Sequence, residues 1–339
     1  MIKRDNVFGS ILGAAAGDAM GAVTETMTPQ QIKKNYDGVV KDFLKPVDSS
    51  PSRGRLAGQV TDDFSQAYQL MSVIIKARGV VTTDLAKAAI LQWWLSDAGY
   101  FQRFAGPTTK VAIQHLMENG ARVGAENQMH PNAYATNGAA MKIFPIGLLN
   151  HGNVEKAVED AVTISLVTHN NQLAISGACA VAAAVSAAVS EDSLENVLKA
   201  SVYGAEQGEK RGREMAIMVA GPSVAKRIVL AMELAKRATT VETAMIQIYD
   251  LIGTGIHVSE AVPAALGLLA ATNGNPVKGI VAAVNIGNDT DTIATILGAI
   301  AGAMKGTKVF PEEWILLLNQ RNGYNLEALA DDFYAIAKK

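Results

Sequence analysis

Apolar residues recur at helical spacing along most of the chain. From residue 7 to residue 22 they fall on one helix face at Phe8, Ile11, Leu12, Ala15 and Ala19. The same spacing returns after residue 63 at Phe64, Ala67, Tyr68, Met71, Ile74 and Ile75. Runs of β-branched residues bounded by turns, which are typical of strands, are nearly absent. The pattern therefore predicts an all-α protein with roughly a dozen or more helices.

The periodic pattern weakens over one long polar segment, residues 30–58. This segment is neither rich enough in proline and glycine nor long enough to be a domain linker. The last part of the chain again has helical patterns, at Glu312–Asn319 and Leu326–Ala337. We therefore expect one all-helical domain over residues 1–339.

Glycines repeat every four residues in the first predicted helix, at Gly9, Gly13 and Gly17. Because glycine has no side chain, this row would let another helix approach closely. Asp18 is the only charged residue between Val7 and Ala22. Glu25 follows the helix and is either an exposed loop residue or a carboxylate that points into a pocket.

The charge balance bears on the partners of the protein. The 339 residues include 30 basic and 32 acidic side chains, which gives a net charge of −2. A nucleic-acid-binding surface would show a basic excess or stripe, so no nucleic-acid partner is expected. Hydrophobic residues make up 49% of the chain and charged residues 18%, which indicates helices packed closely around small residues.

The single cysteine, Cys179, excludes an internal disulfide framework. It lies in the apolar run Ala174–Val189, where a buried structural thiol is expected rather than a nucleophile. This run is too rich in alanine, serine and glycine to be a convincing membrane span. The N-terminus, with Asp5 and Asp18 near its apolar run, does not indicate a signal peptide. A cytoplasmic protein without membrane segments is expected.

Two aspartates stand in an otherwise apolar stretch. Asp289 and Asp291 are the only charged residues between Lys278 and Lys305, and no basic residue lies close to them in sequence. Burying unpaired carboxylates costs several kcal/mol or forces them to take up protons. A helix start at Thr292 would place them where the helix dipole favours negative charge. They therefore indicate either a divalent cation or a capped helix with one aspartate as the N-cap.

A second acidic pair, Asp62 and Asp63, follows Thr61 and also opens a predicted helix. The two Thr/Asp clusters could form one oxygen-lined pocket if these helix ends converge. Oxygen ligands suit Mg²⁺, Mn²⁺ or Ca²⁺ rather than a zinc–thiolate site. Without a cation, each close carboxylate pair would repel by ~4 kcal/mol at an effective dielectric constant of 20. The alternative is a helix N-terminus with two favourable acidic residues.

Several motifs occur in the order found in ADP-ribosylglycohydrolases. They are Gly17-Asp18-Ala19-Met20-Gly21 with Glu25, Thr61-Asp62-Asp63, Asn137-Gly138-Ala139-Ala140-Met141, Thr168-His169 and Asp289-Thr290-Asp291-Thr292. From about residue 7 to about residue 305 the chain resembles this family, which includes the enzyme that reactivates ADP-ribosylated dinitrogenase reductase. The resemblance implies a compact orthogonal multi-helix bundle with two Mg²⁺ or Mn²⁺ ions in a central cleft.

The resemblance also implies residue roles. The metal ligands would be Thr61, Asp62, Asp63, Asp289, Asp291 and Thr292. The catalytic residues would be Glu25, Asp62 and Asp291. The ribose and phosphates would be held by Asn137, Gly138, Ala139 and His169, with Gly255 and Ile256 on the far side of the cleft. Considered without the resemblance, His169 follows a predicted helix in a turn, where a solvated or capping histidine is typical.

The expected reaction is hydrolysis of an N- or O-glycosidic bond at C1 of the ribose of an ADP-ribosylated substrate, protein-linked or small. The ions would hold the ribose hydroxyls and lower the pKa of a bound water, which the carboxylates would orient. The segment Ala133–Thr136 lacks the glycines that would let backbone amides approach a pyrophosphate closely. This leaves open a ribosidase that acts on a nucleoside or another small ribosyl compound.

Two further functional classes are compatible with parts of the sequence. A non-catalytic, ligand-binding descendant is possible because fold does not fix function, although all the acidic ligands are present. A metal phosphohydrolase is disfavoured because no arginine or lysine stands beside either acidic cluster in sequence. A monomer or small homo-oligomer is expected.

Overall fold

The computed structural model describes residues 2–118, 130–190 and 193–339. Within these ranges the chain forms seventeen α-helices and no β-strand, which confirms the all-α prediction. The first six helices are α1 (Arg4–Gly21), α2 (Pro29–Asn35), α3 (Asp62–Lys76), α4 (Thr83–Ser96), α5 (Ala98–Phe104) and α6 (Pro107–Met117). Two short 3-10 helices follow, η2 (Pro131–Tyr134) and η3 (Asn137–Ala139).

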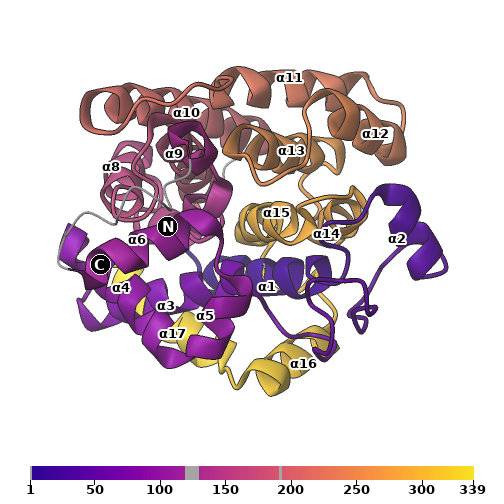
Figure 1. The fold of residues 1–339 in the computed structure, drawn as a ribbon, viewed down its shortest axis with the longest axis horizontal. Helices are drawn as coiled ribbons and strands as arrows, with labels where there is room; N and C mark the ends of the chain where they lie inside the picture. The colour runs from indigo at the N-terminus through magenta and orange to yellow at the C-terminus, as the bar shows by residue number, and fades with distance from the viewer. Residues whose placement is uncertain (1, 119–129, 191–192) are drawn as a thin grey trace.

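The remaining helices complete a bundle whose helices cross at varied angles (Figure 1). They are α7 (Phe144–Leu149), α8 (Val154–Ser165), α9 (Gln172–Ala188), α10 (Leu194–Met215), α11 (Val224–Arg237) and α12 (Val241–Leu251). The last five are α13 (Val258–Ala271), α14 (Pro276–Asn285), α15 (Thr290–Lys305), α16 (Glu312–Asn322) and α17 (Leu326–Ala337). An ion pair between Arg4 and Asp331, 2.6 Å from Nε to Oδ1, ties α1 to α17.

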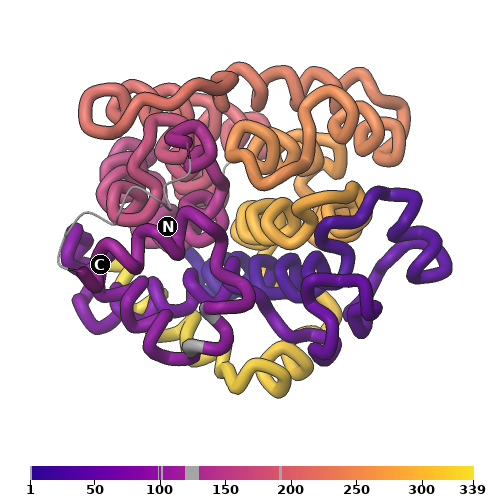
Figure 2. Tube along the Cα trace, viewed as in Figure 1, coloured from indigo at the N-terminus to yellow at the C-terminus, as the bar shows by residue number. Residues whose placement is uncertain are grey.

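Helices α1 and α15 pack side by side through the middle of the molecule, as the indigo and orange-yellow traces of Figure 2 show. The glycine row of α1 lies directly on the backbone of α15. A Cβ atom built on Gly13 would lie 2.1 Å from the Gly298 oxygen, and one on Gly17 would lie 2.2 Å from the Ala294 oxygen. The expectation that these glycines admit another helix is confirmed. The register of this contact decides which residues of the two helices meet.

Helix α9 forms a second part of the core and packs against α7, α8 and α10. Every one of its residues is buried, including Cys179. Burial raises the pKa of the Cys179 thiol to about 12, so it stays protonated and unreactive, as expected of a structural thiol. Among residues 2–118, 130–190 and 193–339, no helix combines the length and the apolar character needed to cross a membrane.

Candidate active site

The candidate site forms where the C-terminal end of α1 meets the N-terminal ends of α3 and α15. Gly21, the last residue of α1, touches α15 at Asp291, where a Cβ atom would lie 2.4 Å from the Asp291 Cα. The close helix contact therefore continues up to the acidic residues. Packing of small residues places the site, and no long loop is needed to assemble it.

Asp18 joins α1 to α3, a role that its sequence context does not predict. Its carboxylate accepts hydrogen bonds from the backbone N–H groups of Thr61 and Phe64, each at 2.9 Å, and from Thr61 Oγ1 at 2.8 Å. A carboxylate from one helix thus satisfies the free amides at the start of another. The only signal for this in the sequence was a single charge within a helix of glycine and alanine.

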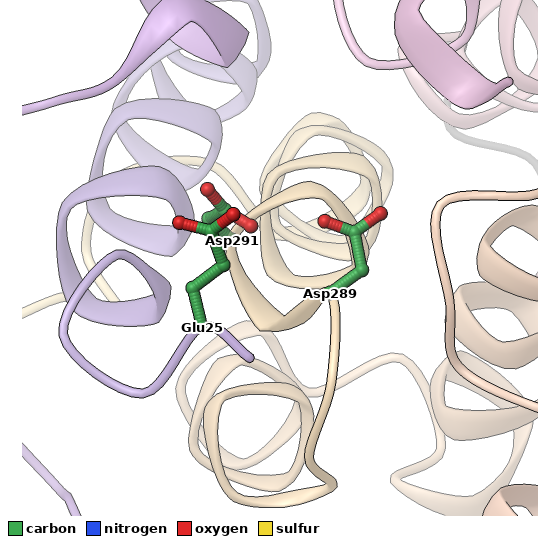
Figure 3. Close-up of side chains that lie close together, drawn as sticks. All are labelled: Glu25, Asp289 and Asp291. Atoms are coloured by element: carbon green, nitrogen blue, oxygen red, sulfur yellow. The ribbon is translucent and has the colours of Figure 1, made fainter. Parts of the chain in front are cut away.

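Glu25, Asp289 and Asp291 turn their carboxylates toward one another (Figure 3). Each offers one oxygen, and these three oxygens lie within 4.8 Å of one another. The interpretation of Glu25 as an exposed loop residue is wrong, because the residue is only partly exposed and its carboxylate faces Asp289 and Asp291. Burial first, and then the charges of Asp291 and Asp289, raise the pKa of Glu25 well above its ordinary value.

Helix α15 begins at Thr290, two residues before the predicted start at Thr292. Asp289 occupies the N-cap position, but its side chain makes no cap hydrogen bond. It accepts a hydrogen bond from the Asn137 side-chain amide instead. Asp289 is therefore the N-cap residue by position, as the second interpretation predicted, but its carboxylate is directed across the site and does not cap the helix.

The second acidic pair belongs to the same electrostatic cluster. Asp62 is 8% exposed and Asp63 is 3% exposed. Burial and the nearby charge of Asp291 raise the pKa of Asp62 to about 8, and the same two causes raise that of Asp63 well above its ordinary value. The charge of Asp62 in turn contributes to a raised pKa at Asp289. The two acidic motifs, far apart in sequence, therefore interact through their charges, while the oxygens that converge within 4.8 Å are those of Glu25, Asp289 and Asp291.

The residues of this cluster fit a divalent cation. Their donors are carboxylate oxygens, the type that Mg²⁺, Mn²⁺ and Ca²⁺ prefer. Asp63 Oδ1 is buried and has no hydrogen-bond partner among the described residues, which leaves it available as a ligand. A cation would also offset the burial and the mutual repulsion that together hold the pKa values of these carboxyl groups high. The acidic group could therefore hold a divalent metal ion.

A buried lysine lies behind the cluster, which the sequence did not predict. Lys142 Nζ donates a hydrogen bond to Gln66 Oε1 at 2.8 Å, and Gln66 Nε2 donates one to Asp62 Oδ2 at 3.2 Å. Burial lowers the pKa of Lys142 to about 8, against the opposing attraction of Asp62 and Asp63. No basic residue is next to the acidic clusters in the sequence, but in the structure Lys142 lies near Asp62 and Asp63. The inference that no basic residue stands beside these clusters is therefore wrong. Lys142 is nevertheless buried and its ammonium group is engaged by Gln66 and Thr168, so it does not offer a phosphoryl-binding group.

One wall of the site comes from the predicted substrate-binding segments. The backbone N–H of Asn137 donates to the Ile256 oxygen at 3.0 Å, so the turn at 137–139 and the loop at 253–257 are held together. Ile256 is 54% exposed at this edge. The N–H of Gly255 is already bonded to Glu260 Oε2 at 2.9 Å. Backbone hydrogen bonding therefore fixes this wall before any ligand binds.

His169 lies inside the protein, 1% exposed, so the interpretation as a solvated histidine is wrong. Its Nε2 is 3.2 Å from Thr136 Oγ1 and its Nδ1 is 2.9 Å from Thr168 Oγ1. Gly138 packs on the ring so closely that a Cβ atom would lie 2.7 Å from Nε2. Burial, and then the charge of Lys142, lower the pKa of His169 well below its ordinary value. The histidine is neutral and braces the turn that carries Asn137.

Mn²⁺ should stabilise the protein more at about pH 8 than at about pH 6. Burial and Asp291 raise the pKa of Asp18 to about 7 and of Asp62 to about 8, against 3.8 when unfolded. Without a cation, the folded protein keeps these protons at pH values where the unfolded chain has already released them. The stability of the folded state therefore falls as pH rises from the unfolded pKa toward the folded one. A cation competes with those protons, so it binds more tightly at the higher pH. Melting temperatures with and without Mn²⁺ measure the effect, and equal shifts at both pH values would contradict it.

Fold and site together define an all-α protein with an acidic, oxygen-lined centre. The model of the ADP-ribosylglycohydrolase family matches residues 1–339. An uncharacterised protein of Archaeoglobus fulgidus is 32% identical, over 96% of this chain and 95% of its own. The ADP-ribosylhydrolase ARH3 of Xenopus tropicalis is 28% identical, over 91% and 89%.

Among solved structures, an ADP-ribosylglycohydrolase-related protein complex has a chain with the same fold. The TM-score is 0.68 and the identity 23%, over 98% of each chain. The chain belongs to the ADP-ribosylglycohydrolase family, which confirms the resemblance seen in the sequence. It is a hydrolase of this type, a glycosidase.

Proposed function

We propose that the protein cleaves an N- or O-glycosidic bond at C1 of the ribose of an ADP-ribosylated substrate, with the help of divalent cations. One observation carries the proposal. The carboxylate oxygens of Glu25, Asp289 and Asp291 converge within 4.8 Å, beside the turn that holds Asn137. Family membership adds the reaction class, because the matching family is that of the ADP-ribosylglycohydrolases and one of the relatives named above is an ADP-ribosylhydrolase.

Two Mg²⁺ or Mn²⁺ ions are proposed as the cofactors. Their ligands would be Thr61, Asp62, Asp63, Asp289, Asp291 and Thr292. The side chains of all six are buried at the two helix N-termini. When bound, the ions supply positive charge that offsets the carboxylates and polarises oxygen atoms of the substrate and of water.

The residues of the protein itself have four tasks in this proposal. Glu25, whose carboxylate faces Asp289 and Asp291, orients the attacking water and accepts its proton. Asp62 and Asp291 supply negative charge near C1, which favours a transition state that resembles an oxocarbenium ion. Asn137 fixes the Asp289 carboxylate through its amide and lines the substrate side of the cleft. His169 and Gly138 support that wall from behind.

A second candidate is a ribosidase that acts on a nucleoside or a small ribosyl compound. The observation that favours it is the hydrogen bonding of the segment expected to face a pyrophosphate. The N–H groups of Ala133, Ala135 and Asn137 donate to oxygens of His130, Asn132 and Ile256. With the N–H of Gly255 bonded to Glu260, four backbone donors of this wall are already used within the protein and are not offered to phosphate oxygens. A substrate with fewer phosphates would need fewer of them.

Assaying three substrate classes side by side separates these functions. ADP-ribosylated protein, O-acetyl-ADP-ribose and plain nucleosides would each be incubated with the protein and Mn²⁺ or Mg²⁺. Release of ADP-ribose from the first two, lost on chelation and restored by the ion, is the expected result. Turnover of nucleosides alone would establish the second candidate. No turnover of any substrate, together with no thermal shift on adding Mn²⁺, would favour a non-catalytic descendant.

A further inference from the structure

Lys142 carries a buried positive charge that two neutral side chains hold. The residue is 5% exposed, and its Nζ lies 2.8 Å from Gln66 Oε1 and 3.4 Å from Thr168 Oγ1. A pKa of about 8 keeps the ammonium group charged at neutral pH. An ammonium group has three hydrogens to donate and no atom that accepts. Gln66 and Thr168 must therefore turn acceptor atoms toward it.

This requirement fixes the orientation of the Gln66 side-chain amide. Because Oε1 accepts the hydrogen bond from Lys142, the NH₂ group points the other way and donates to Asp62 Oδ2 at 3.2 Å. The opposite orientation would place NH₂ against the ammonium group and the amide oxygen against a carboxylate, so both contacts would be repulsive. Gln66 is 3% exposed, so little water reaches either contact. The lysine thus decides that Asp62 meets a hydrogen-bond donor.

The same requirement acts through Thr168 on the other side of the lysine. The Thr168 hydroxyl oxygen accepts from Lys142, and its own hydrogen is left for His169 Nδ1, 2.9 Å away. A neutral imidazole carries one hydrogen, which is then on Nε2, 3.2 Å from Thr136 Oγ1. Thr136 Oγ1 lies 3.0 Å from Thr108 Oγ1, so its hydrogen has an acceptor as well. This chain of hydrogen bonds assigns the Nε2–H tautomer to His169.

We propose that Lys142 is a positioning residue that sets the direction of the hydrogen bonds on two sides of the acidic site. Its ammonium group turns the amide hydrogens of Gln66 toward Asp62. Through Thr168 it also holds His169 in the Nε2–H tautomer. In both directions the lysine acts through a neighbour, so it needs no contact with substrate or ion.

The two branches end at residues from both acidic motifs. Gln66 holds one oxygen of Asp62. The ring of His169 packs under Gly138, in the turn whose Asn137 amide donates to Asp289. Replacing side chains that orient metal ligands from behind typically costs roughly 10–100-fold in metal affinity. The inference rests on the proposed function in one respect, because it takes Asp62 and Asp289 as ligands of a divalent cation.

Calorimetric titration of the metal-free protein with Mn²⁺ tests the branch through Gln66. Lys142→Met should weaken Mn²⁺ binding about tenfold or more, because the donor to Asp62 is no longer fixed. Loss of a positive charge would by itself strengthen the binding of a cation, so the sign of the change distinguishes positioning from charge. In a Gln66→Met background the lysine has no amide to turn, and Lys142→Met should have a smaller effect there. Lys236→Met, at an exposed position of α11, is the control and should change the affinity less than about twofold.

The outcomes separate this inference from the proposed function. Mn²⁺ binding that is unchanged or tighter in Lys142→Met would overturn the role of the lysine, as would equal effects of that substitution with and without Gln66. A wild-type protein that binds no Mn²⁺ would overturn the proposed cation site and the positioning of its ligands together. Thermal unfolding of each variant verifies that it is folded.

Nitrogen-15 NMR of histidine-labelled protein tests the branch through Thr168 and needs no metal ion. The chemical shifts of the two ring nitrogens show which one carries the hydrogen, and the His169 signals are those lost in His169→Gln. The Nε2–H tautomer is expected in the wild type. A share of the Nδ1–H form is expected in Lys142→Met, where the Thr168 hydroxyl is free to accept. The Nδ1–H form in the wild type, or a tautomer that does not change in Lys142→Met, would overturn this branch.

Discussion

Asp289→Asn should reduce hydrolysis of the glycosidic bond by roughly a thousandfold or more and weaken Mn²⁺ binding. The substitution keeps the shape of the side chain but removes the charge that faces Glu25 and Asp291. Losing a ligand forfeits several kcal/mol of transition-state stabilisation, which corresponds to a rate loss of this size. Release of ADP-ribose measures the rate, and calorimetric titration with Mn²⁺ measures the metal affinity.

Asp84→Asn is a suitable control for this experiment. Asp84 is an exposed residue in the first turn of α4 and pairs only with Lys87, at 3.3 Å, in the part of the chain that the structure describes. Exposed pairs of this kind contribute little, so activity and metal affinity should stay within about twofold of wild type. If Asp289→Asn turned over its substrate at the wild-type rate, the assignment of the acidic cluster as the active site would be wrong.

Gly17→Ala should destabilise the protein by about 3 kcal/mol or more. The added Cβ would lie 2.2 Å from the Ala294 oxygen and 2.8 Å from the Thr295 nitrogen, both backbone atoms that cannot turn aside. Helix α1 would have to move away from α15, and overpacking of this kind is costly. The same movement would separate Asp18 from Asp291, so hydrolysis should fall together with stability. Chemical denaturation gives the free energy of unfolding.

Gly99→Ala is the matched control, and its expected effect has the opposite sign. Gly99 is an exposed residue of α5, and a Cβ atom there would approach nothing closer than 3.4 Å. Alanine is favoured over glycine within a helix by up to about 1 kcal/mol, so this variant should be neutral or more stable. Equal effects of the two substitutions would show that the contact between α1 and α15 is not as tight as the backbone distances indicate.

Several features of the site are visible in the sequence because they depend on local spacing. A glycine at every fourth position marks one helix face, and the structure places that face on α15. A threonine before paired aspartates marks the start of a helix, and α3 does begin at Asp62. The isolated charge of Asp289 in an apolar stretch could be recognised as a candidate ligand before any fold was known. Such signals are local because helix geometry repeats within a few residues.

The start of α15 shows the limit of local signals. The sequence predicted Thr292 as the first helical residue, but the helix begins at Thr290. In the structure the backbone N–H of Asp289 donates to the Thr254 oxygen at 2.9 Å. The two residues of this contact are 35 positions apart in the sequence. A helix end fixed by a partner from elsewhere in the chain cannot be located from its own residues.

The sequence by itself determined the all-α class, the close-packing face of the first helix and the two acidic motifs. Only the tertiary structure decided that Asp18 accepts hydrogen bonds from the N-terminus of α3, that Lys142 is linked to Asp62 through Gln66 and that His169 is buried. The physical reason is that helical periodicity is set by neighbours along the chain. The environment of a charge or an imidazole, in contrast, is set by whichever distant segments pack around it.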